Sequence, residues 1–457
     1  MLFRALNEFL TPFRLTVLSF LLAILIGTCL LKLPFATVTP ISWVDCLFTS
    51  TSAVCVTGLI VVDTATRFTR FGQIVILTLI QFGGLGIMTL STIFLVVLRG
   101  RVSFTNIKVV RDTFTSGAGV DIYSLLKLIV IFTMTVEAAG SALLFLRFRK
   151  IFPLSTAIFH SIFQAISAFC NAGFSTFSDS LMSFRGDVLV NLVMAGLIIV
   201  GGIGFLVVWE VRKCVRRFVR REKRTRVLSL HTKLVLIVTA CLLLLGTVLY
   251  AAIEWNILLT GLPWYEKVLA SFFQSVTTRT AGFNSIDIRG LANASILITI
   301  FLMFVGASPG STGGGIKTST FGVLIALGIS RLRSVEEVNM FKRTLSKFSV
   351  WRALSVTLTA IAVISTATML LMLTEGGISP FLDTPGMFVE ILFEVVSAFG
   401  TVGLSLGITS GLSSIGKIII VLVMYTGRLG PMLIALAISP REKRARFKYA
   451  EEQVMIG

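Results

Sequence analysis

The sequence predicts an all-α integral membrane protein built from four similar units, and three observations lead to this prediction. Of the 457 residues, 55% are apolar and only 14% are charged, and the mean hydropathy is +0.93. The apolar residues form eight runs long enough to cross a bilayer, for which about 20 residues suffice. A Phe-to-Gly motif recurs four times between these runs at a nearly constant interval. This composition excludes a soluble globular protein.

The connections between the runs differ strongly in charge, and this difference predicts orientation. Connections 99–127, 210–233 and 330–352, together with the two terminal segments, hold about 27 of the 41 Lys and Arg residues. Basic loops remain on the cytoplasmic side, so both termini are expected to be cytoplasmic. The predicted spans cover residues 14–33, 71–98, 124–146, 188–209, 233–253, 294–329, 351–373 and 415–438.

One cytoplasmic connection is exceptionally basic. Two explanations remain open for this loop and for the C-terminal stretch Arg441 to Glu452: attraction to anionic lipid, or docking of a cytosolic protein. No nucleic-acid partner is expected, because loop charge in a membrane protein reports topology. The basic residues of the loop are Arg212, Lys213, Arg216, Arg217, Arg220, Arg221, Lys223, Arg224 and Arg226.

The four outward connections each contain a moderately apolar segment of about 10 to 12 residues, which is too short to span and suits a re-entrant helix. In each one a Phe precedes a Gly by ten residues. The intervals between these glycines divide the chain into units 1–99, 100–222, 223–335 and 336–457. The four segments read FTSTSAVCVTGL (Phe48 to Leu59), FQAISAFCNAGF (Phe163 to Phe174), FFQSVTTRTAGF (Phe272 to Phe283) and FEVVSAFGTVGL (Phe393 to Leu404).

A glycine-rich cluster follows each motif glycine within the next span. The clusters are Gly83-Gly84-Leu85-Gly86, Gly201-Gly202-Ile203-Gly204, Gly306 to Gly315, and Gly427-Arg428-Leu429-Gly430. Close helix packing is one explanation for such glycines.

Irregular backbone at membrane depth is tolerated only where it is buried in protein or lines an aqueous path. Four such loops therefore indicate something polar at their centre. A glycine in each loop allows a positive φ, and the preceding short helix directs its partly negative C-terminal end to the same place. Rings of carbonyls then form a site for a dehydrated cation. The predicted filter residues are Cys55, Val56, Thr57, Gly58, Cys170, Asn171, Ala172, Gly173, Arg279, Thr280, Ala281, Gly282, Gly400, Thr401, Val402 and Gly403.

Potassium is expected at backbone carbonyls of two residues before each of these glycines. These residues are Val56, Thr57, Asn171, Ala172, Thr280, Ala281, Thr401 and Val402.

The sixth run contains a segment that cannot stay continuously helical, because proline and many glycines lie in its middle. A break into two half-helices joined by a loop is expected, and a gate explains so many flexible residues better than a packing kink does. Arg428 is a charge inside the last span, which costs about 2.5 to 3.5 kcal/mol on insertion scales. The candidate gate residues are Gly306, Ala307, Ser308, Pro309, Gly310, Ser311, Thr312, Gly313, Gly314, Gly315, Lys317 and Arg428.

With these motifs the sequence resembles the Trk/Ktr/HKT superfamily of cation transporters from about residue 14 to 438. It is most similar to the Ktr-type bacterial membrane subunit, because a single span precedes the first filter glycine. The resemblance implies four pseudo-symmetric repeats around one central pore, each made of a transmembrane helix, a re-entrant pore helix with a filter loop, and a second transmembrane helix. It also implies that Arg428 and the glycine-rich segment obstruct the pore beneath the filter.

Function and partners follow from the same resemblance. It implies potassium uptake across the plasma membrane of a bacterium, since glycine at all four filter positions is typical of potassium-conducting members. The chain is expected to form a homodimer among membrane lipids and to bind a cytosolic ring of RCK domains that carries ATP, ADP or NAD. No cofactor is expected on this chain, and a sodium requirement stays open. Arg279 departs from the uncharged pattern of the other filters, and we expect it behind the third one.

Two other classes of membrane protein share some of these features. A secondary carrier with alternating access also has broken helices and internal repeats, but usually has carboxylates at the midplane, whereas the clearest intramembrane acid, Glu137, is expected toward the outer end of its span. An intramembrane enzyme needs an acid–base or metal constellation. His160 and His231 have no partner at ligand spacing, so we expect no enzymatic activity.

Overall fold

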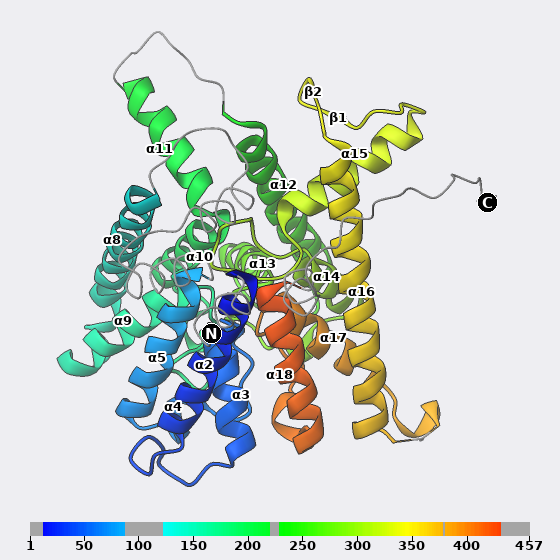
Figure 1. The fold of residues 1–457 in the computed structure, drawn as a ribbon. Helices are drawn as coiled ribbons and strands as arrows, with labels where there is room; N and C mark the ends of the chain where they lie inside the picture. The colour runs from blue at the N-terminus through cyan, green and yellow to red at the C-terminus, as the bar shows by residue number, and fades with distance from the viewer. Residues whose placement is uncertain (1–11, 87–121, 220–227, 378–379, 431–457) are drawn as a thin grey trace, which may run out of the picture.

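The computed structural model describes residues 12–86, 122–219, 228–377 and 380–430, and these are almost entirely helical (Figure 1). The main helices are α2 (Pro12–Leu31), α3 (Trp43–Val54), α5 (Arg70–Gly84), α8 (Ile122–Phe148), α9 (Leu154–Phe169), α10 (Val188–Ile203), α11 (Phe205–Val219), α12 (Leu230–Glu254), α13 (Trp264–Thr277), α14 (Asn293–Phe304), α15 (Thr318–Leu332), α16 (Lys347–Glu375), α17 (Met387–Gly400) and α18 (Ser414–Leu429).

The remaining elements are short. They are α4 (Thr64–Arg67), the 3₁₀ turns η1 (Met182–Phe184), η2 (Ile288–Gly290), η3 (Phe381–Asp383) and η4 (Thr409–Gly411), and the antiparallel pair β1 (Asn339–Met340) and β2 (Arg343–Thr344).

The helices form four units of span, short helix and span, as the sequence predicts. In each unit the short helix packs against the first span, in the pairs α2–α3, α8–α9, α12–α13 and α16–α17. The second span then packs against the short helix of the next unit, in the pairs α5–α9, α10–α13, α14–α17 and α18–α3. The last contact returns from the fourth unit to the first, so the four units close into a ring.

The short helices α3, α9, α13 and α17 have 12 to 16 residues. At 1.5 Å per residue they reach at most about 24 Å, which is less than the hydrocarbon thickness, so none of them is long enough to cross the membrane by itself. Their starts are well defined by the sequence. Ser42 caps α3 by accepting a hydrogen bond from the Asp45 amide, and Pro153 and Pro263 precede α9 and α13.

The third unit differs in register from the sequence-based alignment. Phe48, Phe163 and Phe393 are fully buried, and in the third unit the fully buried residue is Phe273, while Phe272 is only partly buried. The pairing of Phe272 with Gly282 is therefore wrong, and the third filter segment is one residue shorter than the others. Backbone hydrogen bonds agree: the Ala281 amide bonds the carbonyl four residues earlier, whereas Thr57, Ala172 and Val402 each bond the carbonyl five residues earlier.

Two of the predicted spans are interrupted by a break, although the sequence analysis predicts a break in only one of them. Run 188–209 was expected to be one helix, but α10 and α11 meet at 102°. Gly204 lies at this break with φ +96°, a left-handed conformation that interrupts the helix. The expected break in the sixth run is present, because α14 ends at Phe304 and α15 begins at Thr318.

Two other helices end before the last residue of the predicted run. Helix α5 ends at Gly84 and α18 ends at Leu429, while residues 87–98 and 431–438 lie outside the described part of the chain. Among the described helices, those long and apolar enough to cross a membrane unaided are Lys127–Phe148 of α8, α12 and α16.

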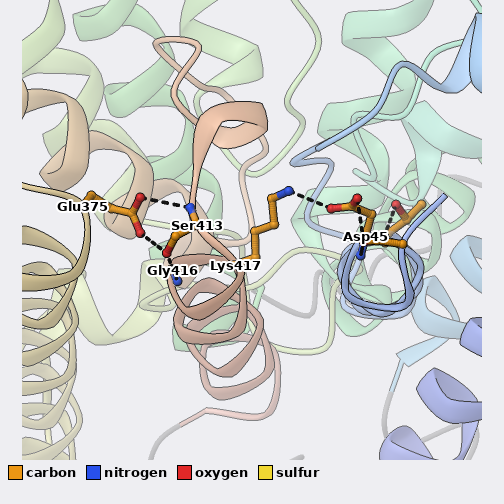
Figure 2. A network of polar contacts seen from close by, with 7 residues as sticks. Asp45, Glu375, Ser413, Gly416 and Lys417 are labelled. Atoms are coloured by element: carbon orange, nitrogen blue, oxygen red, sulfur yellow. Dashed lines mark hydrogen bonds and ion pairs between the residues drawn. The ribbon is translucent and has the colours of Figure 1, made fainter.

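A polar network joins the fourth unit to the first, as Figure 2 shows. The Lys417 ammonium on α18 lies 2.8 Å from the Asp45 carboxylate on α3. Beside it, the Glu375 carboxylate at the end of α16 accepts hydrogen bonds from the Ser413 amide at 3.0 Å and from its hydroxyl at 2.6 Å. The network therefore connects α16, α18 and α3 where the ring of four units closes.

Candidate selectivity filter and gate

The four motif glycines form a closed ring. A Cβ built on Gly58 would contact the carbonyl oxygen of Ala172, and one built on Gly173 would lie 2.9 Å from that of Ala281. The series continues from Gly282 to the carbonyl of Val402 and from Gly403 back to the carbonyl of Thr57. Each glycine therefore lies against the residue that precedes the next glycine, and four backbone carbonyls surround one axis.

The backbone of each loop alternates between two conformations. The four glycines have φ between +69° and +92°. The residues two positions earlier also have positive φ, namely Val56 at +55°, Asn171 at +59°, Thr280 at +67° and Thr401 at +50°. Alternating signs of φ turn successive carbonyls to the same side of the chain, as a cation site of carbonyls requires.

The positive φ of the non-glycine residues escapes sequence analysis, which assigns it to the glycines alone. For a β-branched residue such as Val56 this conformation costs about 1 to 3 kcal/mol, so the surrounding structure must impose it. Side chains of the pore helices supply part of this restraint. Ser52 and Ser397 accept hydrogen bonds from the amides of their own filter glycines, each at 3.1 Å.

In the second and third loops, the pore-helix hydroxyl bonds a carbonyl of the loop instead of the amide of the filter glycine. The Ser167 hydroxyl donates to the Phe174 carbonyl at 2.7 Å, and the Thr277 hydroxyl donates to the Phe283 carbonyl at 2.8 Å. Each of these carbonyls belongs to the residue after the filter glycine, so all four loops are anchored to the helix that precedes them.

A second set of anchors was missed by sequence analysis. The residue after each buried pore-helix phenylalanine is polar and buried: Thr49, Gln164, Gln274 and Glu394. Gln164 donates a hydrogen bond to the Ser175 hydroxyl at 2.7 Å, and Glu394 accepts one from the Ser405 hydroxyl at 2.7 Å. The recurrence of this polar position in all four motifs is the signal that could have revealed it.

The glycine-rich segment between α14 and α15 lies directly against the filter. The Gly314 amide donates to the Thr401 hydroxyl at 3.0 Å. A Cβ on Gly313 would collide with the Thr280 side chain. The segment therefore touches the third and fourth filter loops at the residues that have positive φ.

The same segment is hydrogen-bonded to the second unit. The Ser308 amide donates to the Gly202 carbonyl at 3.0 Å, and the Phe205 amide donates to the Gly310 carbonyl at 3.2 Å. The Thr312 hydroxyl reaches the carbonyl of Phe169, the last residue of pore helix α9, at 3.1 Å. The loop is thus joined to the break between α10 and α11 as well as to the filter.

Arg428 reaches this loop from the fourth unit. Its guanidinium, which is buried, donates to the carbonyls of Thr312 in the glycine-rich segment and of Gly83 at the end of α5. The Lys317 ammonium lies 2.8 Å from the Gly313 carbonyl. The structure therefore brings Arg428, Lys317 and the loop together; their role as a gate stays a prediction.

Arg279 lies behind the third filter. Its buried guanidinium is 3.5 Å from the carbonyl of Gly306, where the glycine-rich segment begins. In the described part of the chain no carboxylate pairs with Arg279, Lys317 or Arg428. Three cationic side chains therefore bind backbone carbonyls next to the filter.

The glycine clusters in the second spans serve close packing. A Cβ on Gly83, Gly201 or Gly427 would collide with the carbonyl at the end of a pore helix, that of Val54, Phe169 or Phe399 respectively. Arg428 takes the next position in the fourth unit, where the first two units have Gly84 and Gly202.

This arrangement offers backbone oxygens to a cation. The described residues contain no group of three or more His, Cys, Asp and Glu side chains placed to hold a metal ion. His160 lies 2.7 Å from the Thr176 hydroxyl among phenylalanine rings.

Glu137 lies behind the second filter, where its carboxylate accepts a hydrogen bond from the Gln81 side-chain amide at 3.1 Å.

Known proteins with similar sequences identify the family of this chain. The family model described as cation transport protein, TrkH, matches residues 7–446. Ktr system potassium uptake protein B is 42% identical in Vibrio alginolyticus, over 97% of this chain and 94% of the relative. The protein of that name in Bacillus subtilis is 39% identical, over 98% of this chain and 97% of the relative.

Two further comparisons extend this picture. The potassium/sodium uptake protein NtpJ of Enterococcus hirae is 37% identical, over 98% of each chain. Among solved structures, the potassium transporter TrkH of Vibrio parahaemolyticus has the same fold, with a TM-score of 0.69 and 18% identity over 92% of this chain and 85% of that one. The extent of the family match and the identity to full-length relatives lead to one conclusion: this chain belongs to the TrkH family of cation transport proteins.

Proposed function

We propose that this chain is the pore-forming subunit of a potassium uptake system. The observation that carries the proposal is the closed ring formed by the carbonyls of Thr57, Ala172, Ala281 and Val402 against the four filter glycines. The C-terminal ends of four pore helices, each with partial negative charge, adjoin these loops. The names of the relatives at 36% to 42% identity, which describe potassium uptake proteins, support potassium as the ion.

Conduction in this proposal is channel-like. A potassium ion exchanges its hydration shell for the carbonyls of the two residues before each filter glycine, and it leaves because binding is shared among neighbouring sites. A carrier would need midplane groups that are exposed alternately to the two sides. The name of the relative NtpJ includes sodium, so a requirement for sodium belongs to the proposal as a variable to be tested.

The gate in this proposal consists of the glycine-rich segment and Arg428. The segment lies against Thr401 and Thr280 of the filter, and Arg428 holds it by the Thr312 carbonyl. The loop would act as a steric barrier and the guanidinium as an electrostatic one. Opening requires the loop to move, and the many glycines reduce the conformational cost of that motion.

Partners and location complete the proposal. The relatives named as parts of a Ktr system point to a separate regulatory subunit. We place the chain in a bacterial plasma membrane as a homodimer with both termini in the cytoplasm. A nucleotide-binding ring of RCK domains would dock on the basic side, and the repeats would correspond to residues 1–99, 100–222, 223–335 and 336–457.

Flux through the purified protein tests the proposal. Rubidium uptake into proteoliposomes should be saturable and competed by potassium, and planar-bilayer recordings should show unitary currents far above carrier turnover. Sodium is varied on each side in turn to test its requirement. Vesicles without protein and vesicles with heat-denatured protein are the controls. Uptake that potassium does not compete, or turnover within the carrier range, would contradict the proposed mechanism.

A further inference from the structure

A buried polar cluster lies behind the second filter and has no part in the proposed gate. The Glu137 carboxylate, on α8, is 4% exposed. It accepts a hydrogen bond from the Gln81 side chain of α5 at 3.1 Å. The thiol of Cys170, the residue at the C-terminus of pore helix α9, lies 3.6 Å from the side-chain amide oxygen (Oε1) of Gln81 and 3.9 Å from the other Glu137 oxygen.

The cluster acts on the filter at a sensitive position. Cys170 is directly followed by Asn171, whose φ of +59° starts the alternating backbone of the second filter. The Asn171 side chain in turn lies 3.1 Å from the Thr280 hydroxyl of the third filter. A shift of the Cys170 side chain would therefore move the carbonyls that follow it and would be felt in the neighbouring loop.

A carboxyl group at this depth is costly, and packing alone does not require it. Charged side chains inside a membrane protein face the interior and mark functional sites. An apolar side chain of similar size would fill the space on α8 without that cost. The residues equivalent to Cys170 in the other three loops are Cys55, Arg279 and Gly400. Within the described residues, Cys170 is the one of these four whose side chain lies beside a carboxylate.

We propose that Glu137 is a positioning residue for the second filter loop, acting through Gln81 and Cys170, and that it tunes discrimination among monovalent cations. The inference rests on the proposed function, because it concerns the same ring of carbonyls. Selectivity in such a ring depends on where the carbonyls lie and how firmly they are held. Loss of the Glu137 contacts leaves the ring in place but loosens one of its four sides.

The test compares potassium, rubidium and sodium uptake by purified variants in proteoliposomes. Glu137→Leu should lower the preference for potassium over sodium by roughly tenfold, since a hydrogen bond to a charged group contributes about that much. Gln81→Leu should act in the same direction. Glu137→Gln, which keeps a polar contact, should have a smaller effect. In the double variant Glu137→Leu, Cys170→Ala the loss should not be additive, because both residues act in one chain of contacts.

Glu254→Gln is the matched control. Glu254 is equally buried, but its carboxylate accepts a hydrogen bond from the Ala292 amide, away from the filter loops. Its ion preference should equal that of the parent.

Slower uptake with an unchanged ion preference in both Glu137→Leu and Glu137→Gln would show a merely structural role and overturn the inference. A parent protein without potassium flux would contradict the proposed function itself. Parent flux with parental selectivity in every Glu137 and Gln81 variant would contradict this inference alone.

Discussion

At the scale of single residues, the filter glycines leave no space for a side chain. A Cβ on Gly173 would lie 2.9 Å from a neighbouring carbonyl oxygen, and the φ of Gly403, +92°, is unfavourable for any other residue. The neighbouring atoms are backbone atoms of the same ring, so they cannot rotate away. Glycine is therefore required at each position for two reasons: its own positive φ, and the close approach of the neighbouring loop.

This requirement predicts the effect of serine at the filter glycines. Gly58→Ser, Gly173→Ser, Gly282→Ser and Gly403→Ser should each reduce the preference for potassium over sodium at least about tenfold, because the carbonyl ring must widen or tilt. Potassium-dependent growth and competition of rubidium uptake by sodium measure the change. Gly196→Ala is the control, since Gly196 lies within α10 with open space beside it. Parental ion preference in all four serine variants would contradict the filter assignment.

Arg428 allows a second prediction at this scale. Arg428→Ala removes a positive charge beside the filter and two hydrogen bonds that hold the glycine-rich segment and α5 together. Arg428→Lys keeps the charge but cannot bridge both carbonyls with the same geometry. Both variants should raise the maximal rate of potassium uptake with a much smaller effect on apparent affinity, and the alanine variant should have the larger effect. Correctly folded variants that transport no faster than the parent would show that Arg428 only anchors its helix.

At the scale of elements, the break between α10 and α11 helps to position the glycine-rich segment. Helix α10 stops at Gly204, and the chain turns by 102° into α11. The amides and carbonyls released by the break bond the glycine-rich segment, as Phe205 does with Gly310. In Figure 1, α11 projects away from the bundle, and it carries the first basic residues of the basic loop, Arg212, Lys213 and Arg216. Its position suits a helix that transmits a force from this loop to the gate.

A substitution at the break tests this connection. In Gly204→Ala the new methyl group would lie 2.6 Å from the Pro309 carbonyl oxygen, and the φ of +96° would be strained. The glycine-rich segment must then shift, so uptake in the absence of a regulatory partner should rise severalfold, as expected for about 1 kcal/mol of strain on a closed state. Deletion within residues 308–314 should act in the same direction.

Gly328→Ala, in the middle of α15 with nothing beside it, is the control for this experiment. Gly204→Ala protein with the uptake rate of the parent and of Gly328→Ala would contradict a link between this break and the gate.

At the scale of the whole molecule, the ring must close between the fourth and first units. The Lys417 and Asp45 side chains at this junction are 15% and 17% exposed, and their charged atoms are 2.8 Å apart. A partly buried pair of this kind contributes about 1 kcal/mol or somewhat more. Lys417→Met and Asp45→Asn should each lower the thermal unfolding temperature in detergent, because each leaves a partly buried group unpaired.

The combination of the two substitutions distinguishes a real pair from two separate effects. The double variant should lose clearly less than the sum of the single losses, with a coupling energy of about 1 kcal/mol. Additive losses would show that the two charges do not stabilise each other.

The side of the molecule with the basic connections, which we propose to be cytoplasmic, leads to a prediction about assembly. Arg212, Lys213 and Arg216 are exposed on α11, and the basic loop continues to Arg226. If this surface docks a regulatory subunit, replacing these basic residues up to Arg226 by Gln should abolish co-purification of that subunit, and in the parent added salt should weaken it. Lys342→Gln and Arg343→Gln, at the β-hairpin, form the matched control. Undiminished co-purification and normal regulation of the neutralised protein would contradict docking here.

The sequence by itself determined the membrane class and the four units, and it indicated the candidate site. These follow from local patterns, since a span is a run of apolar residues and a filter loop is a short motif that recurs. The break in the sixth run was also predictable, because proline and five or more glycines in one stretch cannot remain helical. Arg428 was identified because an isolated charge in an apolar run is conspicuous.

Only the tertiary structure decided the features that depend on contacts between distant segments. The positive φ of Val56 and Thr401 is imposed by anchors on other residues, so their own propensities argue against it. The third motif is one residue shorter, and this becomes visible only when Phe273 rather than Phe272 is buried. The partners of Glu137 are distant in the sequence, and its contacts with Gln81 and Cys170 form because α5, α8 and α9 meet behind the second filter. Local physics determines elements, whereas the placement of a side chain against another unit depends on how the ring of four units closes.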